Sequence, residues 1–343
     1  MSNNDVYVLG IESSCDDTSA AVIHNGEIIS NVIANQEIHA QYGGVVPELA
    51  SRAHQQNIVP VVAQALAKAG VTKEDLNAIC FTSGPGLMGS LLVGTSFAKS
   101  LSLGLDIPLI EVNHMQGHVL AHFIKSTDQK IPPFPFLCLT ISGGHTQIVK
   151  ITNYFEMQVL GETIDDAVGE AYDKSAKLLG LPYPGGPLID KYAQSGNPLA
   201  YKFTKPKVGP MDFSFSGLKT AIRYFLDKQI AADSDFVEKN LADICASIQH
   251  TIVGILMDKL NNAVKETGIT HVAIAGGVSA NSEIRKQLKL MEQKKKWTVY
   301  IPKFEYTTDN AGMIAIAGYL KYLNQDFSDI SVHAKARLKV SDS

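Results

Sequence analysis

One pattern recurs three times along this chain: a short apolar segment ends in a turn rich in polar residues or glycine, and a strand or helix follows. It occurs at residues 9–20, 139–149 and 272–284. Turns of this kind expose backbone N–H groups to an anion, so each of them suits a phosphate group. Because strand-like segments alternate with helical patterns, the sequence predicts an α/β fold.

Three phosphate-type turns in this order resemble the two-lobed superfold of the actin-like ATPases, which includes actin, Hsp70 and the sugar kinases. The resemblance implies that two hairpins grip phosphates and that a Gly-Gly turn cradles an adenosine. We expect an N-terminal lobe over residues 1–112, completed by a C-terminal helix at about 309–330, and a second lobe over residues 113–308. The site is expected in the cleft between the lobes.

The composition is that of an ordinary globular protein, with 45% hydrophobic and 19% charged residues. No run approaches the roughly 18 apolar residues of a membrane span, and the N-terminal residues lack the pattern of a signal peptide. The four cysteines stand far apart in the sequence without paired spacing. They are predicted to be reduced thiols of a cytoplasmic protein that has no membrane partner.

The net charge of −4 excludes a chain that is basic throughout and, taken alone, disfavours nucleic acid as a partner. Basic residues are nevertheless concentrated locally. One cluster comprises Arg285, Lys286, Lys289 and Lys294 to Lys296, and the other comprises His333, Lys335, Arg337 and Lys339. These clusters could contact a phosphate backbone, or they could be the solvated faces of helices.

The first turn places three acids and three hydroxyls within residues 12–18. Hydroxyls and backbone amides suit a phosphate, and carboxylates suit a cation that lies between phosphate and protein. The carboxylates are Glu12, Asp16 and Asp17, and Ser13 and Asp16 are the residues of the turn expected to face the phosphate. A simple solvated turn is the alternative.

Two histidines, His114 and His118, stand four residues apart in a segment predicted to be helical. One helical turn places both rings on the same face, about 6 Å apart, within reach of one metal ion. His122 lies roughly 12 Å from His114 and cannot share an ion with it, so the pair is either His114 and His118 or His118 and His122. The third ligand should be a carboxylate, and Asp309 is a candidate unless it only caps a helix.

A further glycine-rich segment, residues 84–89, fits the dinucleotide-binding pattern G-x-G-x-x-G, with Asp106 at about the right distance. Asp106, however, precedes its strand, whereas the ribose-binding acid should end one. We therefore expect these glycines to allow close packing of a helix on a strand. The sequence contains no Walker A motif, which excludes a P-loop hydrolase.

Nine motifs in order give the chain a specific resemblance to the TsaD family, the threonylcarbamoyladenosine synthase subunits that modify tRNA. The similarity covers about residues 6–320. The motifs are GIESSCDDTSAAV, HAQYGGVVPELASRAH, SGPGLMGSLLVG, NHMQGHVLAH, ISGGHTQIV, IDDAVGEAYDKSAKLLGLPYPGGP, FSFSGLKTA, AGGVSAN and TTDNAGMIA.

The resemblance implies an acyltransferase that moves the threonylcarbamoyl group from threonylcarbamoyl-AMP to N6 of the adenosine 3′ of the anticodon (position 37), in tRNAs reading ANN codons. AMP is released. One Fe²⁺ or Zn²⁺ ion is implied at His114, His118 and Asp309, and Glu12, in the first turn, faces the phosphate. We expect Glu12 or a nearby acid to assist proton removal. The implied substrate contacts are Thr140, Ile141, Ser142, Gly143, Gly144, Asp173, Gly186, Asp190 and Asn281.

The resemblance also implies partners: tRNA, a paralogous dimerisation subunit of the TsaB kind and a small ATPase of the TsaE kind. A separate synthase supplies the adenylate. Archaeal members of the family carry a tyrosine that can reach the metal where Thr140 stands, so a fourth protein ligand is not expected here.

Three other readings compete with this one. A metalloprotease of the zincin type needs H-E-x-x-H, and Met115 follows His114, so the general base is missing. A small-molecule kinase or ATPase of the same superfold would turn over ATP without tRNA. A nucleotide-binding scaffold would bind AMP and form no product.

Overall fold

The chain folds into two compact units, and the computed structural model describes residues 5–36, 39 and 42–342. Unit 1 comprises Met1–Pro132, Asn153–Met157 and Pro302–Ser343, and unit 2 comprises Pro133–Thr152 and Gln158–Ile301. The first boundary therefore differs from the one expected after residue 112. The reason is that strand β5 (Leu109–Asn113) runs directly into helix α3 (His114–Leu120). Helix α3 packs against helix α9 (Ala311–Leu323) of the same unit.

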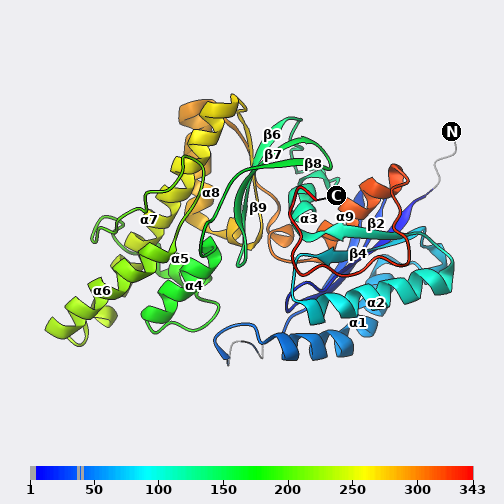
Figure 1. Cartoon of the computed structure of the whole chain (residues 1–343), viewed down its shortest axis with the longest axis horizontal. Coiled ribbons are helices and arrows are strands. Elements are labelled where there is room, and N and C mark those ends of the chain that lie inside the picture. Colours follow the sequence, from blue (N-terminus) through cyan, green and yellow to red (C-terminus); the bar gives the residue numbers. More distant parts are fainter. Residues whose placement is uncertain (1–4, 37–38, 40–41, 343) are drawn as a thin grey trace. The chain divides into compact units, whose positions relative to one another are not determined.

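A five-stranded mixed sheet in the order β3-β2-β1-β4-β5 forms the centre of unit 1 (Figure 1). Strands β1, β2 and β3 are antiparallel neighbours, whereas β1 pairs with β4, and β4 with β5, in parallel. Asn25 and Gly26, a residue pair typical of tight hairpins, join β2 to β3, and both have positive φ. The strands span Tyr7–Glu12 (β1), Thr18–His24 (β2), Glu27–Ala34 (β3), Ala78–Gly84 (β4) and Leu109–Asn113 (β5).

Helices cover both faces of this sheet because side chains alternate along its buried strands. Leu9 and Ile11 of β1 belong to a core cluster that includes residues of α1 (Pro47–Ala69) and α2 (Met88–Leu105). Gly10, between them, faces α9 (Ala311–Leu323) on the other side. In Figure 1, α1 and α2 lie side by side, and α9 and α3 (His114–Leu120) are also in contact.

Unit 2 contains a second five-stranded sheet, in the order β10-β9-β6-β7-β8. It repeats the order of the first sheet: a hairpin, β6 and β7, adjoins parallel strands β9 and β10, as β1 and β2 adjoin β4 and β5. The sequence shows no repeat that would predict this duplication. The strands span Phe136–Ile141 (β6), Thr146–Asn153 (β7), Glu156–Glu162 (β8), His271–Ala275 (β9) and Thr298–Tyr300 (β10).

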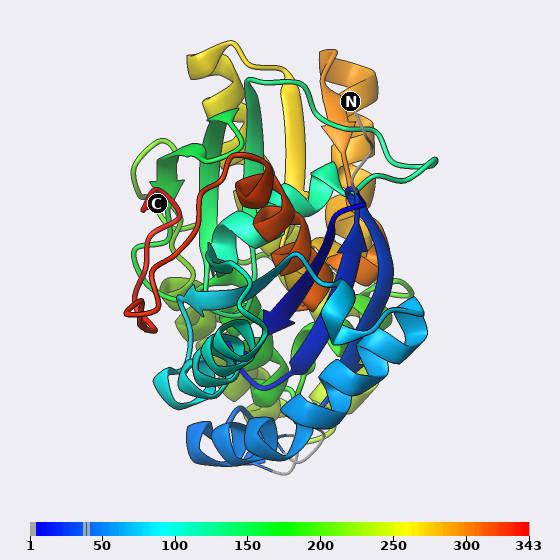
Figure 2. The ribbon, with the colours of Figure 1, turned by 90° about the vertical axis from the view of Figure 1, so that its right-hand side faces the viewer.

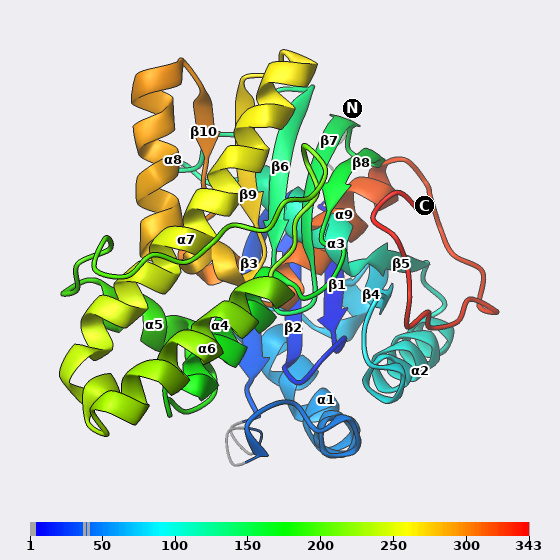
Figure 3. The ribbon, with the colours of Figure 1, turned by 60° about the vertical axis from the view of Figure 1, so that its left-hand side comes forward.

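Five helices complete unit 2, and α7 supplies much of its core (Figure 3). Among the described residues, α7 is the one helix long and apolar enough to cross a membrane, but 67% of its most apolar window is buried inside the protein. This burial is that of a core helix. The helices are α4 (Val168–Leu178), α5 (Gly185–Ala193), α6 (Ser216–Ala232), α7 (Phe236–Thr267) and α8 (Ser282–Lys295).

Two elements have boundaries that local sequence patterns do not indicate. Helix α4 begins only at Val168, because Asp165 binds the backbone and hydroxyls around residues 214–216. The final helix begins at Ala311, and its N-cap is Asn310 rather than Asp309.

The segment after α9 is an extended tail, drawn in red in Figure 2, that is bonded to the start of α3. The side chain of Asn113 caps α3 by accepting a hydrogen bond from the Met115 amide, and it donates to the carbonyl of Lys339 at 2.7 Å. The buried side-chain amide of Gln116 donates to the carbonyl of Val340 at 2.9 Å. The last residues of the chain thus hold the helix that carries both histidines.

The close contact of β1 with α9 gives a test of this packing. A Cβ atom at Gly10 would lie 2.8 Å from the carbonyl oxygen of Ala311 and from Cβ of Ala315, so backbone would have to move. We expect Gly10→Ala to lower the free energy of unfolding by about 1–3 kcal/mol, measured by urea denaturation. Gly104→Ala, at an exposed helical site with no neighbour within 4 Å of the new Cβ, should instead stabilise by about 0.5–1 kcal/mol. Equal effects of the two changes would contradict this account.

Candidate functional site

The turn between β1 and β2 is held by the glycine-rich segment that follows β4. The amide of Leu87 donates to the carbonyl of Ser14 at 2.7 Å, and a Cβ at Gly94 would collide with the hydroxyl of Ser13. The glycines of this segment do allow close packing, but not of a helix on a strand as expected: a Cβ at Gly86 would collide with Ser14 of the turn, and one at Gly89 with Ser51 of α1. The hydroxyl of Ser13 donates to the carbonyl of Ser90, and the residue is only 1% exposed. Its side chain therefore links the turn to α2 within unit 1.

Glu12, at the end of β1, is fully buried, and each of its carboxylate oxygens has a partner. Oε1 accepts a short hydrogen bond from the amide of Ser14, and Oε2 accepts from the hydroxyl of Thr82 at 2.6 Å. Oε2 also lies 3.0 Å from Nδ1 of His114. Since a carboxylate only accepts, Nδ1 carries the proton of this bond, and Nε2 is the ring atom that can bind a metal ion once its own proton is lost.

His114 and His118 lie on one face of α3, as the spacing predicts, with ring centroids 4.8 Å apart. Oδ1 of Asp309 lies 3.4 Å from Nε2 of His114 and 3.1 Å from Nε2 of His118. One ligand atom from each of the three residues falls within 4.8 Å of the others. The structure thus selects the pair His114 and His118 and shows that Asp309 is not the helix cap, a role that Asn310 takes.

The ionisation of this cluster follows from its contacts. Burial alone would raise the pKa of Glu12, but the charge and hydrogen bond of His114 outweigh it and hold that pKa below its usual range. Burial would lower the pKa of His114, but Asp309 and Glu12 raise it well above 6.5. The two histidines likewise hold the pKa of Asp309 well below its usual range, against the effect of burial. Both carboxylates are therefore anionic.

The donor set fits a divalent transition metal. Two imidazoles and one carboxylate are the ligands of catalytic zinc sites and of non-haem Fe²⁺ sites that keep open positions. The side chain of His118 is fully buried and that of Asp309 is 30% exposed, so one side of the site is open. Glu12 behind His114 supplies the carboxylate–histidine pair that orients a metal-binding ring.

The rest of the first turn is half-buried. Asp16 and Asp17 are neighbouring carboxylates of intermediate exposure, and Cys15 lies beside them. The pKa of Asp17 is raised to about 7, mainly by burial and in addition by the charge of Asp16. A hydrogen bond with the Gln36 backbone lowers this pKa, but by less. His54 fixes the turn from α1, since its ring lies 2.8 Å from the hydroxyl of Thr18.

In unit 2, the other two predicted turns are adjacent. The turn after β6 is closed by the bond from the Ser142 amide to the carbonyl of His145 at 2.9 Å. A Cβ at Gly276 would lie 2.5 Å from the carbonyl oxygen of Ile141, so only glycine lets the third turn approach the second. Gly143 and Gly144 are exposed and have open space around them, which leaves their backbone accessible. The Thr140 and Ile141 side chains are buried in the unit.

The remaining expected substrate residues form two hydrogen-bonded groups, one joining Asp173 of α4 to the start of α5 and the other joining α5 to the start of α8. Oδ1 of Asp173 accepts from the amides of Gly185 and Gly186 at 2.8 and 3.1 Å. Asp190, one helical turn after Gly186, accepts from the amide and hydroxyl of Ser282.

Gln249 connects these residues to the third turn. Its side-chain nitrogen donates to Asp190 at 3.0 Å, and its side-chain oxygen accepts from Asn281 at 2.8 Å. Asn281 also caps α8. Sequence reasoning missed both Gln249 and Thr82. Nothing in the sequence marks them, because each lies in a buried element and gains its role only from tertiary contacts.

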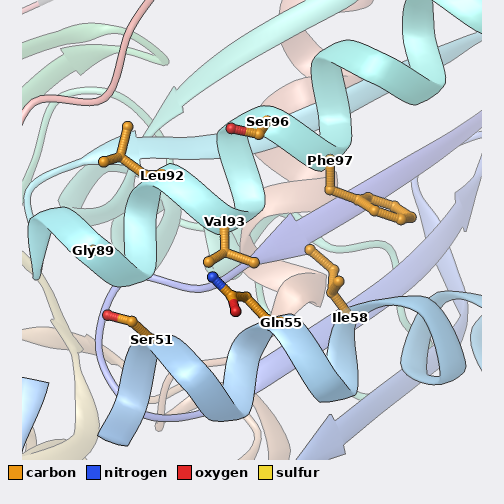
Figure 4. A pocket seen from close by; sticks show the side chains of 8 residues that line it. All are labelled: Ser51, Gln55, Ile58, Gly89, Leu92, Val93, Ser96 and Phe97. Atoms are coloured by element: carbon orange, nitrogen blue, oxygen red, sulfur yellow. The ribbon is translucent and has the colours of Figure 1, made fainter. Parts of the chain in front are cut away.

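A groove of about 560 Å³ between α1 and α2 is separate from these sites (Figure 4). Gln55 and Ile58 of α1 face Val93 and Phe97 of α2 across it. Its lining contains no titratable side chain.

Comparison with known proteins gives a consistent result. The model of the TsaD family, tRNA N6-adenosine threonylcarbamoyltransferase, matches residues 27–316. A protein of that name from Christiangramia forsetii is 71% identical over 99% of this chain and all of its own length. The protein of the same name from Porphyromonas gingivalis is 58% identical over 98% of this chain and 99% of its own.

Solved structures share the fold at low sequence identity. Full-length HypF in a phosphate- and nucleotide-bound form aligns with a TM-score of 0.59 and 13% identity, over 92% of this chain and 46% of its own. Component A of (R)-2-hydroxyglutaryl-CoA dehydratase from Acidaminococcus fermentans aligns with a TM-score of 0.52 and 15% identity. The alignment covers 93% of this chain and 99% of that one. The predicted actin-like α/β superfold is thereby confirmed.

The raised pKa of Asp17 predicts a pH dependence of stability. A carboxyl whose pKa is about 7 in the folded chain and about 4 in the unfolded chain binds its proton more tightly when folded. The free energy of unfolding of the metal-free protein should therefore fall as pH rises from about 4 to about 7. Asp17→Asn should remove this part of the slope in denaturation curves taken across that range, whereas Asp227→Asn, at an exposed site, should leave it. An unchanged slope in Asp17→Asn would refute the assignment.

Proposed function

Because the chain belongs to the TsaD family of tRNA N6-adenosine threonylcarbamoyltransferases, we propose that it takes the threonylcarbamoyl group from threonylcarbamoyl-AMP and releases AMP. The acceptor is N6 of the adenosine 3′ of the anticodon (position 37) in tRNAs reading ANN codons, and the product is t6A. The observation that carries the mechanism is the cluster of His114, His118 and Asp309, oriented by a buried Glu12.

The reaction requires activation of the carbamoyl carbonyl group and removal of a proton from the N6 amine. The N6 amine attacks the carbamoyl carbonyl carbon, a new C–N bond forms, and the bond from that carbon to the phosphate oxygen of AMP breaks. The amine loses a proton, and AMP leaves as a stabilised anion. When bound, Fe²⁺ or Zn²⁺ would supply Lewis-acid polarisation of the threonylcarbamoyl group. The two histidines and Asp309 would hold that ion, and the open side of the site would admit the group.

We assign Glu12 a positioning role rather than that of the base. Its oxygens already accept from Ser14, Thr82 and His114, and the carboxylate is shielded from solvent. A base must reach the proton that it removes. Glu12 instead keeps the proton of His114 on Nδ1 and Nε2 free to act as a ligand. The half-exposed Asp16 and Asp17 are the acids of this turn that can reach a substrate, and Asp16 is proposed to face the phosphate side.

The substrate contacts in unit 2 are part of the proposal. The exposed backbone at Gly143 and Gly144 suits a phosphate or carbonyl oxygen. The Asp173, Gly186, Asp190 and Asn281 networks suit the hydroxyls of a ribose and the edge of a base, with Thr140 to Ser142 fixing the turn. We further propose that the substrate binds in a cleft between the two lobes, with Ser13 supporting the first turn from within.

The partners and the compartment are proposed from the same resemblance. tRNA is the acceptor, a paralogous subunit of the TsaB kind and an ATPase of the TsaE kind assist turnover, and a separate synthase makes the adenylate. Such an enzyme works in the cytoplasm. The family match disfavours a kinase, an ATPase or a protease as the main activity.

The metal proposal predicts a shared loss of metal and activity. His118→Ala and Asp309→Ala should each remove the bound ion, measured by elemental analysis of the purified chain, and lower t6A formation at least about 100-fold. The product is read by nucleoside mass spectrometry after incubation with threonylcarbamoyl-AMP, tRNA and the partner proteins. His250→Ala, at an exposed histidine of α7, should keep both the bound ion and the rate of t6A formation. Full activity in a metal-free variant would overturn the proposal.

The positioning role of Glu12 has a separate test. Glu12→Gln keeps the side-chain volume but removes the charge behind His114, so metal affinity should fall about 10- to 100-fold. Saturating metal should then restore most of the transfer rate. If Glu12 were the base, the variant would stay inactive at every metal concentration although it bound metal normally.

A further inference from the structure

Helix α8 of unit 2 presents a strongly basic face in a chain that is acidic overall. Residues 282–296 contain six lysines and arginines against two glutamates, whereas the whole chain has a net charge of −4. The basic residues are Arg285, Lys286, Lys289, Lys294, Lys295 and Lys296, and all but the half-buried Arg285 are exposed.

The spacing of these residues gathers several of them on one face. A shallow groove of about 480 Å³ is lined by Ser282, Arg285, Lys286, Lys289, Leu290 and Gln293. These positions recur every three or four residues, so they form one stripe along the helix. The opposite face, with Ile284 and Leu288, is buried in the core of unit 2.

The acids of α8 neutralise this stripe only in part. Glu283 pairs with Lys286 at 3.1 Å, but Lys286 is 67% exposed, so the pair is weak. Glu292 is turned to the amide of Val299 at 3.1 Å. Among the described residues, Lys289 has no ion-pair partner, and it stands near the middle of the groove.

The stripe begins at a site already expected to contact substrate. Asn281 caps α8, and Ser282, the first residue of the helix and of the groove, donates to Asp190. From Ser282 to Lys295 the helix rises by about 20 Å. A polyanion that extends from these substrate residues along α8 would thus meet positive charge over this length.

We propose that this face of α8 binds the sugar–phosphate backbone of the tRNA. The inference rests on the proposed function for the identity of the polyanion. A protein partner fits the face poorly, because protein interfaces are centred on buried aromatic or apolar anchors, and Leu290 is the one apolar residue lining this groove. Exposed lysines and an arginine along a stripe are instead the pattern of phosphate contacts.

Two pairs of charge reversals of equal size test the proposal. Lys286→Glu with Lys289→Glu should raise the KM for tRNA at least about 10-fold near physiological salt, while kcat at saturating tRNA stays within about twofold. The slope of log affinity against log salt should fall by about 1.5, as expected for two lost phosphate contacts. Lys228→Glu with Lys265→Glu, at exposed positions on α6 and α7, changes the net charge equally and should leave the KM and the slope unchanged.

The milder pair Lys286→Gln with Lys289→Gln should shift the KM in the same direction by a smaller factor, with an unchanged circular dichroism spectrum. Filter binding of tRNA to the full chain with its partners repeats the comparison without catalysis. If the wild type makes no t6A, the proposed function fails, and filter binding still decides about α8. If the α8 double variant and the control double variant change tRNA binding equally, the proposal is overturned. It is also overturned if the α8 double variant changes only the binding of an acidic protein.

Discussion

The Glu12 carboxylate, which solvent does not reach, connects three elements of unit 1: its own strand β1, strand β4 through Thr82, and helix α3 through His114. An ionised group so deeply buried is stable only when every oxygen is paired. The surrounding structure must therefore keep these donors in place. Gly94 leaves space for Ser13, the glycine-rich segment after β4 supports the turn, and α9 brings Asp309 to the outer side of the histidines.

The two sheets share one strand order, but they present different chemistry at corresponding ends. The hairpin of unit 1 turns through carboxylates and hydroxyls, and that of unit 2 turns through exposed glycines. The segment after β4 is packed against the first turn, whereas the segment after β9 ends at Asn281, within a network that includes Gln249 and Asp190. One architecture thus supports a metal-type donor set in one unit and a set of hydrogen-bonding groups in the other.

Local patterns predicted much of this fold because they act over a few residues. The α/β class follows from the alternation of strand-like and helical patterns, and the hairpin at Asn25-Gly26 and the start of α1 at Pro47 agree with the local preferences of these residues. The histidine pair follows from helical spacing, and Asp309 was a candidate only. Asp309 and Asn310 are adjacent polar residues before an apolar helix, so either could cap it, and only the tertiary structure separates their roles. The duplicated sheet and the partners of Glu12 join residues far apart in the chain, which periodicity does not report.

Asp309 follows His118 by 191 residues, so the parts of the metal cluster are synthesised at very different times. At a translation rate of roughly 5–20 residues per second, the third ligand leaves the ribosome about 10–40 s after the second. During that interval the nascent chain has two imidazoles and the Glu12 carboxylate without their acidic partner. The carbonyls of Lys339 and Val340 that hold α3 come later still. The complete cluster can therefore capture a metal ion only after the segment that carries Asp309 has been synthesised and has packed against α3.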